Sequence, residues 1–171
     1  MIKSKVEAAF NKQFNAEAYS AYLYLSMAAY FEQTQLLGFA HWMTVQAQEE
    51  LSHAMIFYRF INDASGKVAL TTIAAPPSKW DSPLACFQAV LAHEQHVTDL
   101  VNKLLALARK EEDYASEVFL QWFVKEQVEE EASASEIVGK LKLAGKSDNC
   151  LFTMDKDLAG RVFTSPSILV L

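Results

Sequence analysis

The chain has few of the residues that interrupt helices and few that form cross-links. Only five glycines, four prolines and two cysteines occur in 171 residues. Scarce glycine and proline leave long stretches that can form uninterrupted helices. Cys86 and Cys150 are too few and too far apart for a disulfide framework or a Cys-rich iron module. We therefore expect two buried thiols and a cytoplasmic protein.

Three further signals are missing, and each excludes a class of protein. The net charge is -6 and the basic residues are scattered, which disfavours binding to DNA or RNA. The longest uncharged apolar-rich run, residues 18–31, holds 14 residues and is too short to span a bilayer. Glu7, Asn11 and Lys12 interrupt the region where a signal peptide needs a continuous apolar stretch. We expect neither a nucleic-acid partner nor a membrane partner.

Apolar residues repeat at every third or fourth position along four long segments, the spacing of one helical face. This predicts helices at about 4–33, 37–63, 83–110 and 114–144. Asp81 or Ser82 would cap the third helix before Pro83. The first stripe is predicted to include Phe10, Phe14, Ala18, Ala21, Leu25 and Ala28, and the fourth to start at Val118 and Trp122.

The connections between these segments predict an all-α, four-helix bundle. The first and third links are only a few residues long, so they should join antiparallel neighbours. The middle link, residues 64–80, lacks helical periodicity. When extended it reaches about 55 Å, more than the roughly 40 Å length of the neighbouring helices. We therefore expect one long crossover between helices two and three, which makes those two helices parallel.

Beyond the bundle, the sequence predicts a short fifth helix and a tail. We expect residues 1–171 to form one domain, with the bundle at about 4–144 and the fifth helix at about 147–158. The tail, residues 161–171, ends in the apolar run 167–171. A monomer would expose this run, so it predicts a subunit contact, with a frayed end as the alternative.

Acidic residues interrupt the apolar stripe near the middle of every helix in the bundle. They are Glu17, then Glu50 with His53, then Glu94, then Glu130 with Gln127. Burial of unpaired carboxylates is costly, so four of them need a shared counter-charge. Basic residues near these positions are sparse, whereas two divalent metal ions would cancel about four negative charges. Any one of these residues could lie at the edge of its stripe with its head in water, but their joint pattern favours a metal site.

The ligand order Glu, Glu-x-x-His, Glu, Gln-x-x-Glu resembles that of the ferritin family, over about residues 6–158. The segments that carry the resemblance are NAEAYS at 15–20, AQEELSH at 47–53 and FLQWFVKEQ at 119–127. Non-haem bacterial ferritins are the most similar group. Bacterioferritins have a second Glu-x-x-His where this chain has Gln127 and Glu130, and their haem-ligating Met falls on Leu51. We therefore expect no haem.

This resemblance implies iron storage with ferroxidase activity. Two Fe(II) ions would be oxidised by dioxygen or hydrogen peroxide and stored as ferric mineral in a hollow homo-oligomeric shell of about 24 subunits. The implied first iron ligands are Glu17, Glu50 and His53, and the implied second ligands are Glu50, Glu94 and Glu130, with Gln127 beside them. A further iron site would use Glu49, Glu126, Glu129 and Glu130. Tyr24 and Trp122 would lie beside the iron pair and could donate electrons.

Other interpretations of the same bundle remain open at this point. The main alternative is a di-iron oxidase or peroxidase that stores no mineral. A DNA-protecting relative of ferritin would place its metal at a subunit interface, which Glu94 and Glu130 argue against. In a purely structural bundle, Glu49, Glu126 and Glu129 would form a solvated acidic face and the aromatic residues would be ordinary core.

Overall fold

The structure, a computed structural model, describes residues 1–166. Its helices are α1 (Ser4–Gln33), α2 (Leu37–Asp63), α3 (Pro83–Lys110), α4 (Tyr114–Ala144) and α5 (Asp148–Leu158). No strand occurs within the described part of the chain. The predicted all-α bundle with a short fifth helix is confirmed. The predicted subunit contact at 167–171 lies outside the described residues.

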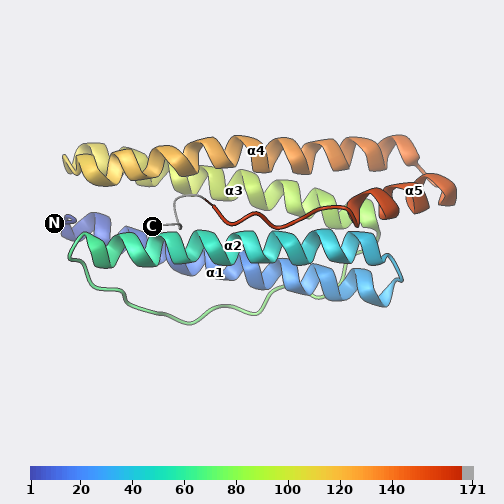
Figure 1. Cartoon of the computed structure of the whole chain (residues 1–171), viewed down its shortest axis with the longest axis horizontal. Coiled ribbons are helices and arrows are strands. Elements are labelled where there is room, and N and C mark those ends of the chain that lie inside the picture. The colour runs from blue at the N-terminus through green and yellow to red at the C-terminus, as the bar shows by residue number, and fades with distance from the viewer. Residues whose placement is uncertain (167–171) are drawn as a thin grey trace.

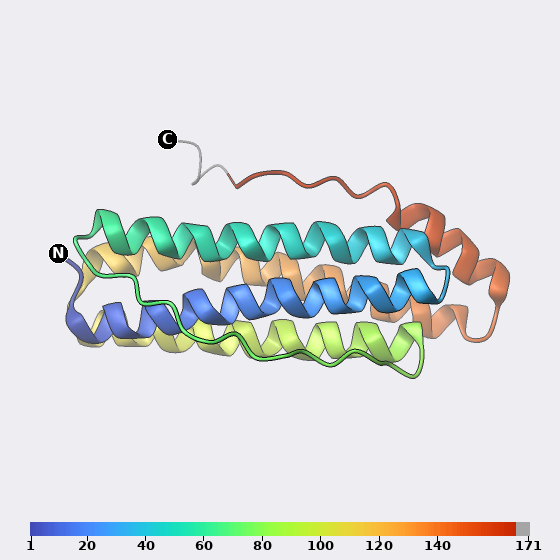
Figure 2. The same ribbon diagram turned by 90° about the horizontal axis from the view of Figure 1, so that it is seen from below.

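The four long helices form two antiparallel hairpins, α1–α2 and α3–α4, that lie side by side (Figures 1 and 2). The crossover from α2 to α3 runs the length of the bundle along α1, so that α2 and α3 are parallel as predicted (Figure 2). Polar side chains of α1 hold this crossover. Asn11 Nδ2 donates to the carbonyl of Lys67 at 3.0 Å, and Ser26 Oγ donates to that of Pro77 at 2.6 Å.

Side-chain caps fix where three of the helices begin. Ser82 Oγ accepts a hydrogen bond from the Ala85 amide at 3.1 Å, directly before Pro83, as the sequence predicts. Ser147 caps α5 by accepting from the Cys150 amide at 3.4 Å. Asp113 caps α4, and its carboxylate also accepts from the Lys3 amide at 2.8 Å. This second bond ties the start of the chain to the α3–α4 turn.

The core consists of two apolar clusters with a buried polar layer between them. One cluster includes Phe31, Phe39 and Phe87, and the other includes Phe10, Phe57 and Phe123. The members of the polar layer come from the middle of all four helices, and they are Gln13, Glu17, Ser20, Gln46, Glu50, His53, Glu94, Gln127 and Glu130. The bundle therefore concentrates its buried charge at mid-length, away from solvent at either end.

Three predictions about burial are wrong. Leu25 is 50% exposed, because the buried face of α1 passes through Tyr24 and Met27 instead. Val118 is 73% exposed, because the inward face of α4 begins with Ser116 and Leu120. Cys86 is buried as expected, whereas Cys150 lies exposed on α5, which has no buried residue.

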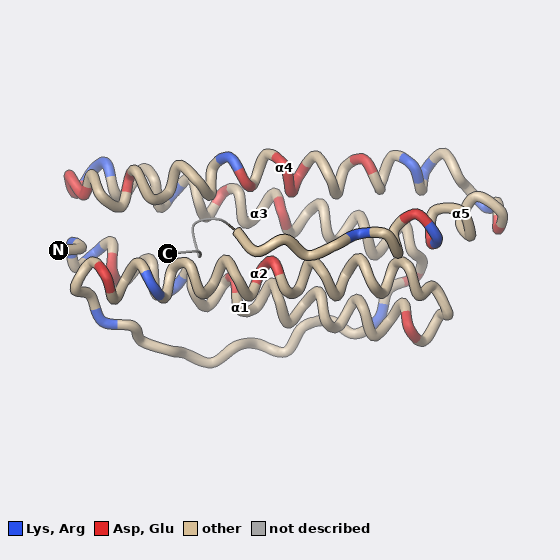
Figure 3. The backbone as a smooth tube through the Cα atoms, viewed as in Figure 1, with Lys and Arg blue, Asp and Glu red and all other residues tan. Residues whose placement is uncertain are grey.

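Charged residues are distributed over all parts of the bundle shown in Figure 3. Lys and Arg positions are spread along the helices, whereas acidic positions recur near the middle of the bundle (Figure 3). Within residues 1–166, none of the helices combines the length and the apolar character that a membrane span requires.

Candidate metal centre

The five predicted ligand residues meet in the polar layer at the middle of the bundle. Glu17 comes from α1, Glu50 and His53 from α2, Glu94 from α3 and Glu130 from α4. Their exposed fractions lie between 1% and 7%. Each projects inward because it occupies an apolar-stripe position of its helix. The structure thus brings together the five residues that the resemblance implies as ligands of the iron pair.

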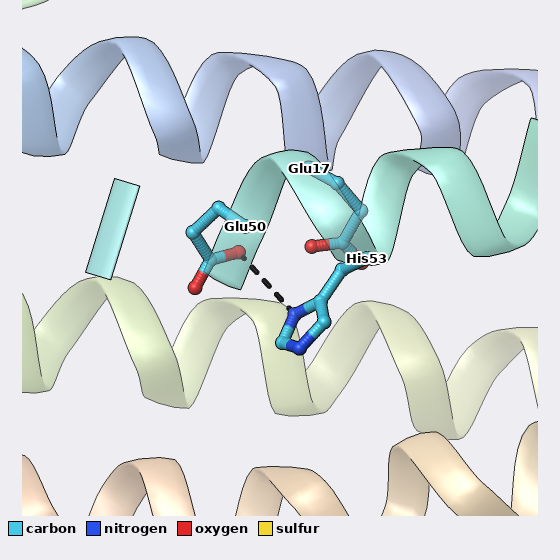
Figure 4. A group of neighbouring side chains, drawn as sticks. All are labelled: Glu17, Glu50 and His53. Carbon is cyan, nitrogen blue, oxygen red and sulfur yellow. Dashed lines mark ion pairs between the residues drawn. The ribbon is translucent and has the colours of Figure 1, made fainter. Parts of the chain in front are cut away.

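The ligand atoms form two overlapping groups. Glu17, Glu50 and His53 each offer one atom within 4.8 Å of the others, and so do Glu50, Glu94 and Glu130. In Figure 4 the side chains of the first group point into one space between the helices, and Glu50 Oε2 lies 3.7 Å from His53 Nδ1. Because Glu50 belongs to both groups, its two oxygens can bridge two cations. This arrangement suits a pair of metal ions bound by oxygen and nitrogen ligands.

Burial makes the carboxylates of this centre poor acids. Burial, together with the charge of a neighbouring glutamate, raises the pKa of Glu17, Glu50, Glu94 and Glu130 to about 8 each. At neutral pH, without cations, these groups would retain protons. Divalent cations reverse that preference because they supply the opposite charge at short range.

Two glutamine side chains orient the carboxylates, and neither was predicted to have a role in the site. Gln46 Nε2 donates to Glu130 Oε2 at 2.8 Å and to Glu50 Oε1 at 3.1 Å, so it links α2 to α4. Gln13 Nε2 donates to Glu17 Oε1 at 2.8 Å. Each glutamine lies on the buried face four residues before the glutamate that it contacts in its own helix. That spacing was the available sequence signal.

Tyr24 and Gln127 both contact Glu94. The Tyr24 hydroxyl donates to Glu94 Oε1, and burial raises the pKa of this phenol well above its ordinary value. Gln127 Nε2 donates to the Glu94 carbonyl at 3.3 Å and lies 3.4 Å from both Glu94 Oε2 and Thr98 Oγ1. Tyr24 and Gln127 therefore adjoin the second ligand group. Trp122 instead packs against His53, with ring centroids 5.4 Å apart.

The predicted further iron site lies beside this centre, around a pocket of about 550 Å³. Glu49, Glu126, Glu129 and Glu130 all line the pocket. Glu126 and Glu130 form a third group of mutually close ligand atoms with His53. Within residues 1–166, neither Glu49 nor Glu129 belongs to such a group. Glu49 instead forms an ion pair with Arg161, a residue that the sequence interpretation overlooked.

Comparisons with known proteins agree with this geometry. The family profile of the ferritin-like domain matches residues 7–144. A bacterial non-heme ferritin of Bacteroides fragilis is 45% identical over 161 residues, which cover 94% of this chain and 100% of that protein. One from Staphylococcus saprophyticus is 39% identical over 163 residues, which cover 95% of this chain and 98% of that protein.

Solved structures are similar to the whole bundle. An engineered closed form of the Archaeoglobus fulgidus ferritin has a TM-score of 0.95 and 52% identity, covering 96% of this chain and 100% of that one. An open pore ferritin from the same archaeon has a TM-score of 0.94 and 51% identity, with 95% and 100% coverage. With its profile match, its near full-length relatives and its fold in agreement, the chain belongs to the ferritin-like family.

Proposed function

We propose that this protein stores iron and that it oxidises Fe(II) at the centre in its four-helix bundle. The observation that supports this most directly is the convergence of four buried carboxylates and one imidazole from four helices. Such a set is unfavourable without cations, and its oxygen and nitrogen donors suit iron. Its relatives are ferritins over nearly the whole chain, which favours storage over an oxidase that keeps no mineral.

The substrate is a pair of Fe(II) ions, and each ion would be bound by a different group of residues. Glu17, Glu50 and His53 would hold one ion, and Glu50, Glu94 and Glu130 the other. Because the pKa values of the glutamates are raised to about 8, iron binding releases protons at neutral pH. Each Fe(II) gives up one electron, and dioxygen or hydrogen peroxide accepts the pair. Tyr24, whose hydroxyl donates to Glu94 Oε1, would supply a further electron and orient Glu94.

Gln127 is proposed to keep the second position weak, so that ferric product leaves it. A neutral amide holds Fe(III) less tightly than a carboxylate would. Gln127→Glu should therefore slow the release of product in stopped-flow turnover, with the first oxidation little changed. Release that is unchanged or faster would contradict this role. The pocket at Glu49, Glu126 and Glu129 would receive the iron on its way to storage.

Storage requires an enclosed space, which one chain does not provide. We propose a homo-oligomeric shell of about 24 subunits, each a single domain over residues 1–171, in the cytoplasm. Two measurements on purified protein test this together: mass by size-exclusion chromatography with light scattering, and amber colour after aerobic addition of Fe(II).

A shell that turns amber and retains iron through gel filtration supports storage. Rapid oxidation by a small species that retains no iron would instead indicate a non-storage oxidase. Colourless protein that takes up no Fe(II) would indicate a structural bundle. The same samples show whether haem is absent, through the absorbance of the protein as isolated.

A further inference from the structure

The segment after α5 returns along α2 in the direction of the metal centre (Figures 1 and 2). Its starting point is fixed, because Asp155 Oδ1 accepts hydrogen bonds from the amides of Gly38 at 2.8 Å and Phe39 at 3.0 Å. A Cβ at residue 38 would lie 1.6 Å from the Asp155 carbonyl oxygen. Glycine at this position therefore permits the close approach that docks α5 onto the first turn of α2.

Arg161 makes three contacts with one face of α2. Its backbone carbonyl lies 2.7 Å from His41 Nε2, its guanidinium carbon lies 4.3 Å from the centroid of the Trp42 ring, and Nη2 pairs with the Glu49 carboxylate. The first two contacts hold the residue at the helix surface, and the third places its positive charge on an acidic side chain. Burial raises the pKa of Glu49, and the positive charge of Arg161 partly opposes that rise.

Arg161 also forms part of the wall of the inner acidic pocket, the 550 Å³ space lined by Glu49, Glu126, Glu129 and Glu130. It is the one Lys or Arg among the described residues that line this pocket. An independent feature next to this pocket, at a residue outside its lining, also indicates a cation. His53 Nε2 is buried without a hydrogen-bond partner, and His53 forms a group of mutually close ligand atoms with Glu126 and Glu130. In Figure 4 this second ring nitrogen points away from Glu17 and Glu50.

We propose that Arg161 is a built-in cation of the inner acidic pocket and competes with metal ions for Glu49. This inference rests on the proposed function, since it concerns how metal is held at the pocket beside the iron pair. Before metal enters, the guanidinium neutralises Glu49. When a divalent ion binds at Glu126 and Glu130, beside His53, the positive charge opposes it and withholds Glu49 from the ligand set.

The contact with Trp42 makes this competition reversible. An arginine that gives up its carboxylate partner usually loses its position, but the aromatic face offers the guanidinium a second favourable contact. Arg161 can therefore release Glu49 and stay on α2, ready to return. The effect is to keep the pocket a weak binding position, so that metal passes through it.

Zinc binding to the apoprotein shell tests the competition without redox chemistry. We expect two tight Zn(II) ions per chain at the four-helix centre and a weaker third one at the pocket, measured by isothermal titration and located by anomalous diffraction. Arg161→Gln and Arg161→Met should tighten the third site by roughly five- to tenfold. Arg161→Lys retains the charge and should stay within about twofold of the unchanged protein. Arg109→Gln is the matched control. Arg109 also pairs with a glutamate, Glu117, but it lies at the C-terminal end of α3 and does not line the pocket.

Glu49→Gln separates competition from simple packing. In that background Arg161→Gln should tighten the third site less than it does in the unchanged protein, because only the repulsion between the guanidinium and the metal ion is then removed and no ligand is released. Arg161→Met replaces the guanidinium with an uncharged apolar chain that can still pack on the Trp42 ring, so it guards against misfolding of the tail in the Gln variant. A third site that is unchanged or weakened in both Arg161 variants, with two tight ions retained, would overturn the proposal for Arg161 alone. Loss of the two tight ions from the unchanged protein would instead overturn the proposed function.

Discussion

The metal centre and the inner acidic pocket are both rich in glutamate, but their negative charge is neutralised in different ways. In the centre the carboxylates are almost fully buried and no Lys or Arg among the described residues pairs with them. In the pocket Glu49 is partly exposed and pairs with Arg161. A dry cluster of carboxylates needs bound metal or protons, whereas a partly hydrated one can be neutralised by a side chain. The difference predicts tight binding in the centre and transit in the pocket.

The largest effect should follow removal of the residue shared by both ligand groups. Glu50→Ala takes one ligand from each metal position, so the initial rate of Fe(II) oxidation should fall at least about 100-fold. Stopped-flow absorbance measures this rate. Glu136→Ala is a matched control, because Glu136 is exposed and pairs with Lys140. Near-normal oxidation by Glu50→Ala would show that the centre does not bind iron through this bridge.

A smaller loss should follow removal of a residue that orients ligands without binding metal. Gln46 fixes one oxygen of Glu50 and one of Glu130. Gln46→Leu keeps the burial and removes both hydrogen bonds, so affinity for the second metal ion should fall about 10- to 100-fold. Zinc titration would measure it. Binding of the first ion, through Glu17 and His53, should change much less, and an equal loss at both positions would argue against a local role.

The raised pKa values make the stability of the metal-free protein depend on pH. Between about pH 4.5 and 8 the unfolded chain gives up protons that the folded centre keeps, so stability is greatest at low pH and falls as pH rises through about 8. With chelator present, we expect Tm to fall by about 10 °C between about pH 5.5 and 8.5. Calorimetry measures the change. Excess Zn(II) should abolish it, and Glu50→Gln should reduce it; a flat profile would mean that the carboxylates ionise freely in the folded state.

The smallest effect on chemistry should come from the pocket. Glu129 is exposed and belongs to none of the close ligand groups among the described residues. Glu129→Gln should leave the first oxidation within about twofold of the unchanged rate, because the centre keeps all its ligands. Later turnovers should slow if iron passes through the pocket. If Glu129→Gln slowed the first turnover as strongly as Glu50→Ala does, the centre and the pocket would have to be treated as one functional site.

The helices and the convergence of the five central residues could be predicted because each leaves a periodic trace in the sequence. Glu17 and Glu94 stand on apolar stripes, and a carboxylate among buried neighbours is an anomaly visible without coordinates. The same periodicity misplaced Leu25 by one position, since neighbouring residues differ by only 100° around a helix. Whether the five central residues, Gln127 and the pocket glutamates bind metal stays a prediction.

Arg161 could not be predicted, because its contacts depend on where a non-helical segment travels. The tail has no periodic pattern, and its path follows from the docking of α5 through Asp155. Gln46 stands four residues before Glu50 on the same helix, but its bond to Glu130 crosses between helices far apart in the sequence. Contacts that depend on tertiary arrangement left no signal in a single sequence.

The division of the bundle into two hairpins means that the two metal positions differ mechanically. Glu17, Glu50 and His53 all belong to α1–α2, so that hairpin alone would carry the first ion. Glu94 and Glu130 belong to α3–α4. The second ion would therefore cross-link the two hairpins, with Glu50 as its ligand from α1–α2 and two carboxylates as its ligands from α3–α4. A small separation of the two hairpins would weaken binding of the second ion and leave binding of the first ion unchanged. Amide exchange along α3 and α4 should therefore follow occupancy of the second position.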